Sequence, residues 1–168
     1  MTLDIRFAVQ SDLDLLWDFL AIAAYEPDAQ CARAVPLVAD HLRGWQRPCD
    51  FGFIAYRDGD ALGAAWGRQF EQKENPVFFV NSRTPEVSIG VREVARGQGI
   101  GQALLKALID EAHRRDVGLC LNVRDTNPAC RLYGRMRFRR ISGLEIPNRV
   151  GGLSFGMILG DLPGPGSS

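Results

Sequence analysis

The sequence lacks a long hydrophobic run and any sign of an export signal. The longest early apolar run, residues 19–25, is far shorter than the roughly 20 residues that a membrane-spanning helix needs. The N-terminal segment carries Asp4 and Arg6, which do not fit the pattern of a signal peptide. The sequence therefore predicts a cytoplasmic protein with no membrane partner.

The sequence also lacks excess charge and clustered metal ligands. Twenty basic residues balance 20 acidic ones, so the composition does not favour nucleic acid as a partner. The four cysteines form no C-x-x-C pair, and neither histidine has a companion that would suit a metal site. We therefore expect no disulfide framework and no metal, and we expect His41 and His113 to be ordinary residues on helix surfaces.

The apolar content is sufficient for one core. The chain has 168 residues, of which 46% are hydrophobic, and this size is typical of one domain. We expect a single domain over residues 1–160. Residues 161–168, rich in proline and glycine, predict a flexible C-terminal tail.

The stretch 86–115 carries the strongest pattern. Val87, Ile89 and Val91 alternate as in a strand, and a glycine-rich turn over residues 96–101 leads into a segment with helical spacing. Backbone N–H groups at a helix start lack partners and carry partial positive charge, and glycines leave room for an anion to approach them. The stretch predicts a strand, an anion-binding loop and a helix.

The glycine spacing excludes two common phosphate-binding motifs. A dinucleotide-binding fold requires glycine at the sixth position from Gly97, where Gln102 stands. A P-loop requires Gly-Lys-Ser/Thr, but Lys106 lies in the middle of the predicted helix. A structural turn that binds nothing remains an alternative for the loop alone.

The remaining pattern is Arg-x-x-Gly-x-Gly, formed by Arg96, Gly99 and Gly101 after an Ile-x-Val strand. It resembles the acetyl-CoA-binding motif of the GNAT N-acetyltransferases. The later run Asn127-x-Ala129, followed by Leu132-Tyr133, resembles the second signature of that family. The sequence departs from the family pattern at one position shortly after this run.

That departure is Arg137, which precedes Phe138 where the family usually has glycine. A basic side chain adds bulk near this turn, so we expect the local backbone to differ there. The position lies outside the cofactor motif.

The resemblance implies an α/β (α+β) fold with a mixed, mostly antiparallel sheet flanked by helices. Its two central strands, residues 86–91 and 119–123, would run parallel and splay apart to admit acetyl-CoA. The implied cofactor-binding residues are Ile89, Gly90 and Val91 for the pantetheine arm, Arg96, Gly97, Gln98, Gly99, Ile100 and Gly101 for the pyrophosphate, and Asn127 for the pantetheine end.

Acetyl transfer to an amine needs one group to remove a proton and another to supply one. We expect Glu86 to act as general base, with a water chain as the alternative, and Tyr133 as general acid to the departing thiolate. No histidine stands near Cys120 or Cys130, so we expect direct transfer without an acyl-enzyme.

The segments outside the two motifs predict further elements. A strand covers residues 3–9, a helix follows it, a second helix runs from about residue 34 to residue 44, and a hairpin turns at Asp58-Gly59. The exposed strand near the C-terminus offers an edge through which two copies could pair as a homodimer.

Three functions remain open. The favoured one is an N-acetyltransferase acting on a primary amine of a small molecule or a protein. The others are a non-catalytic acyl-CoA-binding sensor domain and an ordinary α/β domain with a structural glycine turn. The sequence does not identify the acceptor. A cationic amine would suit a site in which several carboxylates and aromatic rings converge. The candidates for such a site are Glu26, Asp28, Glu71, Glu74 and Glu86, with Tyr25 and Trp66.

Overall fold

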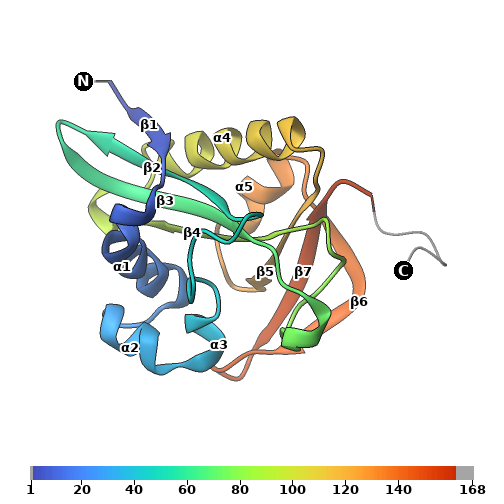
Figure 1. Cartoon of the computed structure of the whole chain (residues 1–168). Helices are drawn as coiled ribbons and strands as arrows, with labels where there is room; N and C mark the ends of the chain where they lie inside the picture. The colour runs from blue at the N-terminus through green and yellow to red at the C-terminus, as the bar shows by residue number, and fades with distance from the viewer. Residues whose placement is uncertain (1, 162–168) are drawn as a thin grey trace.

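A seven-stranded sheet with the order β1-β2-β3-β4-β5-β7-β6 forms the centre of the molecule (Figure 1). The computed structural model describes residues 2–161, so the predicted tail lies outside the described residues except for Asp161. The strands are β1 (Asp4–Phe7), β2 (Phe51–Arg57), β3 (Asp60–Arg68), β4 (Glu86–Val91), β5 (Leu119–Arg124), β6 (Arg139–Pro147) and β7 (Leu153–Leu159).

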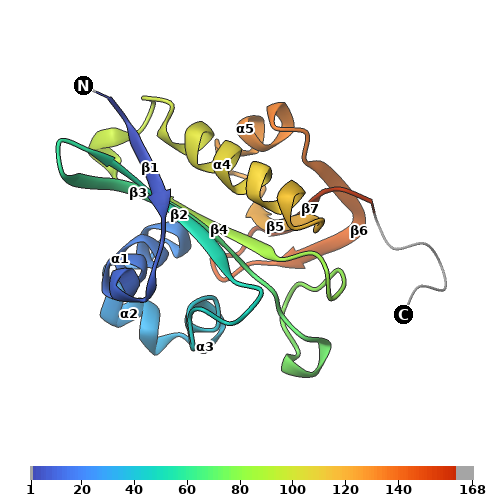
Figure 2. The same ribbon diagram turned by 45° about the horizontal axis from the view of Figure 1, so that its top comes forward.

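Helices cover both faces of this sheet. They are α1 (Leu13–Ala24), α2 (Ala29–Ala34), α3 (Pro36–Ala39), α4 (Ile100–Arg114) and α5 (Cys130–Arg135), with 3-10 turns η1 (Gln10–Asp12), η2 (Gln72–Glu74) and η3 (Glu93–Ala95). Helices α1 to α3 lie on one face and α4 and α5 on the other (Figure 2). Each face has its own apolar core.

The predicted mixed sheet is confirmed. All neighbouring strands pair antiparallel except β4 and β5, which run parallel and share only the register pair Glu86 and Cys120. Beyond that pair the two strands diverge. Because side chains alternate along a strand, Val87 packs in the α4 core while Glu86 and Ser88 face the side of α1.

The close packing of α1 against β4 leaves no room for a side chain at Gly90. A Cβ atom added at Gly90 would collide with the backbone carbonyl of Phe19 in α1. A larger residue would therefore push α1 away from the sheet, so this glycine keeps the α1 layer close to the diverging strands.

The sequence prediction of one helix over residues 34–44 is wrong. The structure has two short helices, α2 and α3, separated at Val35, which is extended with φ −98° and ψ 106°. Proline disfavours helical geometry in the residue before it, and Pro36 follows Val35 directly. The predicted hairpin is confirmed, with β2 and β3 joined at Asp58-Gly59.

Arg137 adopts a left-handed backbone conformation, with φ 70°, in the turn between α5 and β6. This conformation is the physical reason why glycine suits the position, since a Cβ atom clashes with the backbone there. The bulk of the side chain is not the difficulty, because Arg137 is exposed.

Replacing Arg137 with glycine should stabilise the fold by up to about 1 kcal/mol, because it relieves left-handed strain. The melting temperature should rise by roughly 2–4 °C, measured by calorimetry. Arg135→Gly is the matched control, because a glycine inside α5 should destabilise by up to about 1 kcal/mol. Equal losses for both variants would contradict the assignment of strain to residue 137.

Candidate active site

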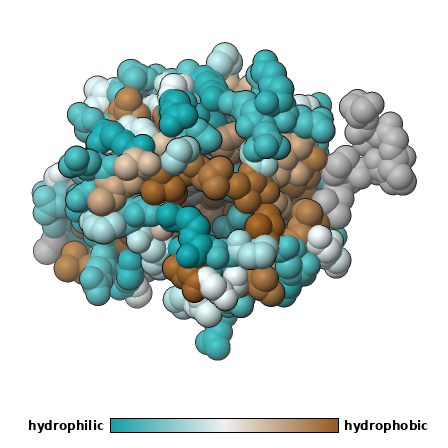
Figure 3. All heavy atoms as spheres, turned by 90° about the horizontal axis from the view of Figure 1, so that it is seen from below, coloured by the Kyte–Doolittle hydropathy of each residue, from teal (hydrophilic) through white to brown (hydrophobic). Residues whose placement is uncertain are grey.

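A cavity of about 310 Å³ opens between the diverging ends of β4 and β5. Side chains from both strands line it, together with residues of α1, α3, α5 and the loop before β7. Seen from below, hydrophobic side chains surround a hollow near the middle of this face, and hydrophilic ones ring them (Figure 3). Four of the predicted site residues line the cavity: Glu86, Ile89, Asn127 and Tyr133.

The edge of β4 that faces the cavity is open. Residues 86–91 pair with β3 along one edge, but along the other edge only Glu86 has a register partner in β5. Backbone N–H and C=O groups that lack a strand partner readily bind an extended chain. Ile89, Gly90 and Val91 lie on this open stretch, which suits a ligand with amide groups such as a pantetheine arm.

The predicted anion-binding loop lies just before α4. Gly97 and Gly99 have positive φ angles of 74° and 78°, and a Cβ added at either would meet nothing within 4 Å. The first hydrogen bond of α4 joins the N–H of Ala103 to the carbonyl of Gly99 at 3.0 Å, so the N–H groups of Ile100 and Gly101 have no partner inside the helix. A loop with free N–H groups and open space beside them can receive an anion.

Two arginines lie beside this loop. Arg57, from β2, donates a hydrogen bond to the side-chain oxygen of Gln98 at 2.6 Å, and Arg96 donates to the carbonyl of Val91 at 3.4 Å. Sequence reasoning identified Arg96 but missed Arg57, because their proximity depends on the pairing of distant strands. Both can add positive charge next to the free amides of the helix start.

Tyr133 reaches the cavity from α5. The side-chain oxygen of Asn127 accepts a hydrogen bond from the N–H of Ala129 at 2.8 Å, which caps the turn that leads into α5. The Tyr133 side chain is buried and packs edge-on against Phe138, with ring centroids 6.0 Å apart. Burial holds the pKa of the Tyr133 phenol well above its ordinary value, so the hydroxyl keeps its proton at neutral pH.

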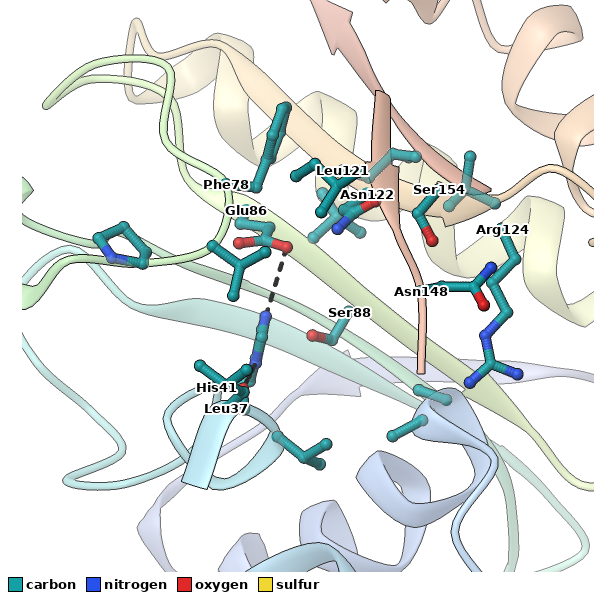
Figure 4. A pocket seen from close by; sticks show the side chains of 18 of the residues that line it. Leu37, His41, Phe78, Glu86, Ser88, Leu121, Asn122, Arg124, Asn148 and Ser154 are labelled. Carbon is teal, nitrogen blue, oxygen red and sulfur yellow. Dashed lines mark hydrogen bonds and ion pairs between the residues drawn. The ribbon is translucent and has the colours of Figure 1, made fainter. Parts of the chain in front are cut away.

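His41 approaches Glu86 across the cavity, although the sequence analysis treated it as a surface residue. That prediction is wrong: Nε2 of His41 lies 3.4 Å from Oε1 of Glu86, and both side chains line the cavity (Figure 4). The other ring nitrogen faces the carbonyl of Leu37 at 3.1 Å. Because both ring nitrogens face oxygen acceptors, the arrangement favours the doubly protonated, charged ring.

Opposing effects set the pKa of His41. Burial lowers it, but the charge of Glu86 and the hydrogen bonds to Glu86 and Leu37 raise it by more, so the net pKa lies above the ordinary histidine value. Only 10% of the Glu86 side chain is exposed and 23% of the His41 side chain, so solvent screens the pair weakly.

A buried arginine holds the backbone that carries His41. Arg68 donates hydrogen bonds to the carbonyls of Asp40 and Arg43 at 3.0 and 2.6 Å, and it pairs with Asp50 at 3.0 Å. The side chains of Arg68 and Asp50 are both 0% exposed. The indole of Trp66 donates to the carbonyl of His41 itself at 3.1 Å. Hydrogen bonds from Arg68 and Trp66 in β3 thus hold the backbone that positions the His41 ring.

The cysteines near the cavity are poor nucleophiles. Cys120 is buried beside Glu86, and burial first, then the nearby carboxylate, raises the pKa of its thiol well above the usual value. Burial also raises the pKa of Cys130. A thiol that keeps its proton attacks weakly, which argues against a covalent acyl-enzyme.

The carboxylates considered for an amine acceptor do not converge. Glu71 pairs with Lys73, Glu74 pairs with Arg47, and Asp28 caps α2. Of the five, only Glu86 lines the cavity. Tyr25 lines it too, whereas Trp66 is fully buried.

Among residues 2–161, no three side chains of histidine, cysteine, aspartate or glutamate gather closely enough to hold a metal ion. Within the same range, no helix combines the length and apolar character needed to cross a membrane.

The fold joins an open strand edge and a free helix start beside one cavity, an arrangement that suits an extended ligand with amide and phosphate groups. The sequence profile described as the Acetyltransferase (GNAT) family matches residues 14–138. The chain therefore belongs to the GNAT acetyltransferase family, whose members take the acetyl group from acetyl-CoA.

Solved structures show the same fold. A structure of yncA, a putative acetyltransferase from Salmonella typhimurium with its cofactor acetyl-CoA, is 21% identical, with a TM-score of 0.70 and coverage of 95% of this chain and 94% of that chain. The ribosomal-protein-S18-alanine N-acetyltransferase from Escherichia coli is 23% identical, with a TM-score of 0.68 and coverage of 94% and 93%. Ribosomal-protein-alanine N-acetyltransferase from Brucella melitensis is 25% identical, with a TM-score of 0.67 and coverage of 93% and 98%. No curated protein matches the sequence significantly.

The raised pKa of His41 predicts how stability depends on pH. A raised pKa means that protonation favours the folded state, and this contribution is complete below the ordinary histidine pKa near 6.5 and is lost as pH rises through the raised value. Wild type should therefore exceed His41→Asn in unfolding free energy by the largest amount at about pH 6. This difference should shrink as the pH rises towards about 9.

Urea unfolding followed at several pH values measures this difference. His113→Asn, on the exposed surface of α4, controls for the general loss of a histidine. A His41→Asn effect that stays constant with pH would contradict a charged pair between His41 and Glu86.

Proposed function

We propose that the protein is an N-acetyltransferase that transfers the acetyl group of acetyl-CoA directly to the primary amine of a small molecule or a protein. The observation that carries the proposal is the position of two proton-transfer groups. Glu86, paired with His41, and the protonated Tyr133 line one cavity beside the open edge of β4. Glu86 enters from the α1 side, and Tyr133 enters from the α5 side.

The residues around the splay fit acetyl-CoA. The backbone of Ile89, Gly90 and Val91 offers unpaired polar groups to the pantetheine arm, with Asn127 near its end. The loop of residues 96–101 would hold the pyrophosphate through its free amides, with charge from Arg96 and Arg57. Bound acetyl-CoA supplies the acetyl group as a thioester.

Glu86 would remove a proton from the acceptor. A primary amine has a reference pKa near 10.4, so its neutral form at pH 7 lies about 4 to 5 kcal/mol uphill. A carboxylate in the cavity can accept that proton as the amine approaches the carbonyl carbon. His41 would hold the carboxylate in place, since the two side chains are in contact.

Tyr133 would protonate the departing sulfur. Its hydroxyl stays protonated at neutral pH because burial raises the pKa of the phenol. As the new C–N bond forms and the C–S bond breaks, the phenol can donate its proton to the thiolate of CoA.

The same cofactor site would serve a non-catalytic acyl-CoA sensor. A sensor needs no acid and no base at the thioester, so the presence of both groups in the cavity favours catalysis.

A single domain over residues 1–160, a cytoplasmic location and a homodimer remain predictions from the sequence.

Substituting Gly99 with glutamate should abolish acetyl-CoA binding. The carboxylate would occupy the space beside the helix start and repel the pyrophosphate. Calorimetric titration should show wild type binding acetyl-CoA in preference to NAD and ATP, and should show binding lost in the variant. Gly143→Glu is the matched control, because Gly143 also has a positive φ, 80°, and is exposed in β6. Equal acetyl-CoA affinity in both variants would refute the loop assignment.

Substituting Tyr133 with phenylalanine, or Glu86 with glutamine, should lower kcat by about 10²-fold or more, because each removes a proton-transfer group. The affinity for acetyl-CoA should change little. Steady-state release of CoA measures kcat, and calorimetry measures binding. Tyr56→Phe, whose hydroxyl accepts a hydrogen bond from Arg6 on β1, is the control. Full activity in Tyr133→Phe would rule out its role as general acid.

A further inference from the structure

The charged side chains that line the cavity are paired, with one exception. Asp40 pairs with Arg43 at 2.9 Å, Arg149 pairs with Glu26 at 2.6 Å, and His41 pairs with Glu86. No carboxylate among residues 2–161 lies within ion-pair distance of Arg124. A cation without an ionic partner in a cavity attracts an anion.

The ring of Tyr25 orients the Arg124 guanidinium. The guanidinium carbon lies 4.4 Å from the ring centroid of Tyr25, at the end of α1. Stacking of this kind fixes the plane of the guanidinium and leaves its N–H edge for a bidentate partner such as a carboxylate. Arg124 therefore presents donors in a set orientation while it lines the cavity (Figure 4).

A second polar group on the same strand also lacks a partner. The side-chain oxygen of Asn122 is buried and accepts no hydrogen bond from residues 2–161. Asn122 lines the cavity and stands two residues before Arg124, on the same face of β5. A buried oxygen of this kind is normally satisfied, so the Asn122 oxygen is available to accept a hydrogen bond from an N–H group.

Their place in the fold assigns both groups to the acceptor rather than to the phosphates of acetyl-CoA. Leu121 and Val123 pack in the core under α4, so Asn122 and Arg124 point to the opposite face, towards α1. The anion-binding loop, in contrast, lies at the start of α4. Glu86 shares the α1 face with Asn122 and Arg124, and the three line one cavity.

The cavity suits a small acceptor. Its volume of about 310 Å³ is near the lower limit of roughly 300 Å³ for small-molecule sites. One wall is the loop before β7, where Arg149 bonds to Glu26 and to the carbonyl of Ala24, and so ties this loop to α1. Asn122 and Arg124 are two positions, or about 7 Å, apart along one face of the strand, so a single small acceptor can contact both side chains.

We infer that the acceptor is a small amine that carries a carboxylate, in the class of the free amino acids. Arg124 binds the carboxylate, the Asn122 oxygen accepts a hydrogen bond from the amine, and Glu86 removes the proton. Apolar residues around the cavity, including Leu37, Val38 and Phe78, receive the side chain. This inference rests on the proposed function and names the substrate class of the same site.

The test compares free amino acids with their carboxamides as acceptors, for example leucine with leucinamide. The full-length protein is assayed with acetyl-CoA, and release of CoA is followed. At least one amino acid should be acetylated with a kcat/KM about tenfold or more above that of its carboxamide. In Arg124→Gln the acceptor KM should rise and the preference for the acid should vanish, while Arg124→Lys should restore part of it.

Calorimetry with acetyl-CoA separates this inference from the proposed function. Arg124→Gln should bind acetyl-CoA as wild type does, and weaker binding would assign Arg124 to a cofactor phosphate and overturn the inference. Arg83→Gln, which removes an exposed arginine paired with Asp116, should leave the preference for the acid unchanged.

If wild type binds acetyl-CoA but acetylates no amino acid faster than its carboxamide, the inference is overturned and the proposed function stands. Failure of wild type to bind acetyl-CoA would instead overturn the proposed function.

Discussion

The separation of β4 from β5 is the constraint on which the rest of the site depends. One register pair, Glu86 with Cys120, joins the two parallel strands, and beyond it each strand follows a different neighbour. Antiparallel partners on the outer edges, β3 and β7, hold both strands in place while the inner edges diverge. The open inner edge of β4 and the cavity beside it both follow from this arrangement.

The pair of His41 and Glu86 depends on contacts between segments that are far apart in the sequence. His41 stands in a segment without regular secondary structure, and such a segment would not normally fix a ring beside a carboxylate. Here the buried Arg68 holds the carbonyls on either side of His41, and its pairing with Asp50 compensates the charge. Removing either partner of this buried pair would leave an uncompensated charge, which is strongly destabilising. The pair therefore holds the loop that carries His41 in one position.

The local parts of the candidate site could be predicted from the sequence. The strand, the glycine loop and the start of α4 are contiguous, so their spacing predicted their arrangement, whereas the placement of Asn127 and Tyr133 followed from the family resemblance. The mixed sheet followed from the family resemblance. These parts account for the proposed cofactor-binding residues and for both proposed catalytic residues.

The remainder depends on contacts between distant segments. His41 and Glu86 are separated by 45 positions, and no periodic pattern links them. Arg57 reaches the glycine loop only because β2 and β3 form a hairpin. Likewise, only the neighbours of Arg124 within residues 2–161 show that none of them is an ionic partner. Arg137 shows the reverse case, in which the sequence flagged an unusual residue and the backbone angle supplied the reason.

The two sides of the cavity also differ in which of their groups a substitution can change. The proposed donor side consists mainly of main-chain groups of β4 and of the loop before α4, and main-chain groups are present whatever the side chains are. The proposed acceptor side consists of side chains of α1, β5 and the β6–β7 loop, which line the cavity. Substitutions on the acceptor side can therefore redirect the enzyme to a new amine while the machinery that holds the donor stays intact, which makes this half of the molecule the natural place to engineer selectivity.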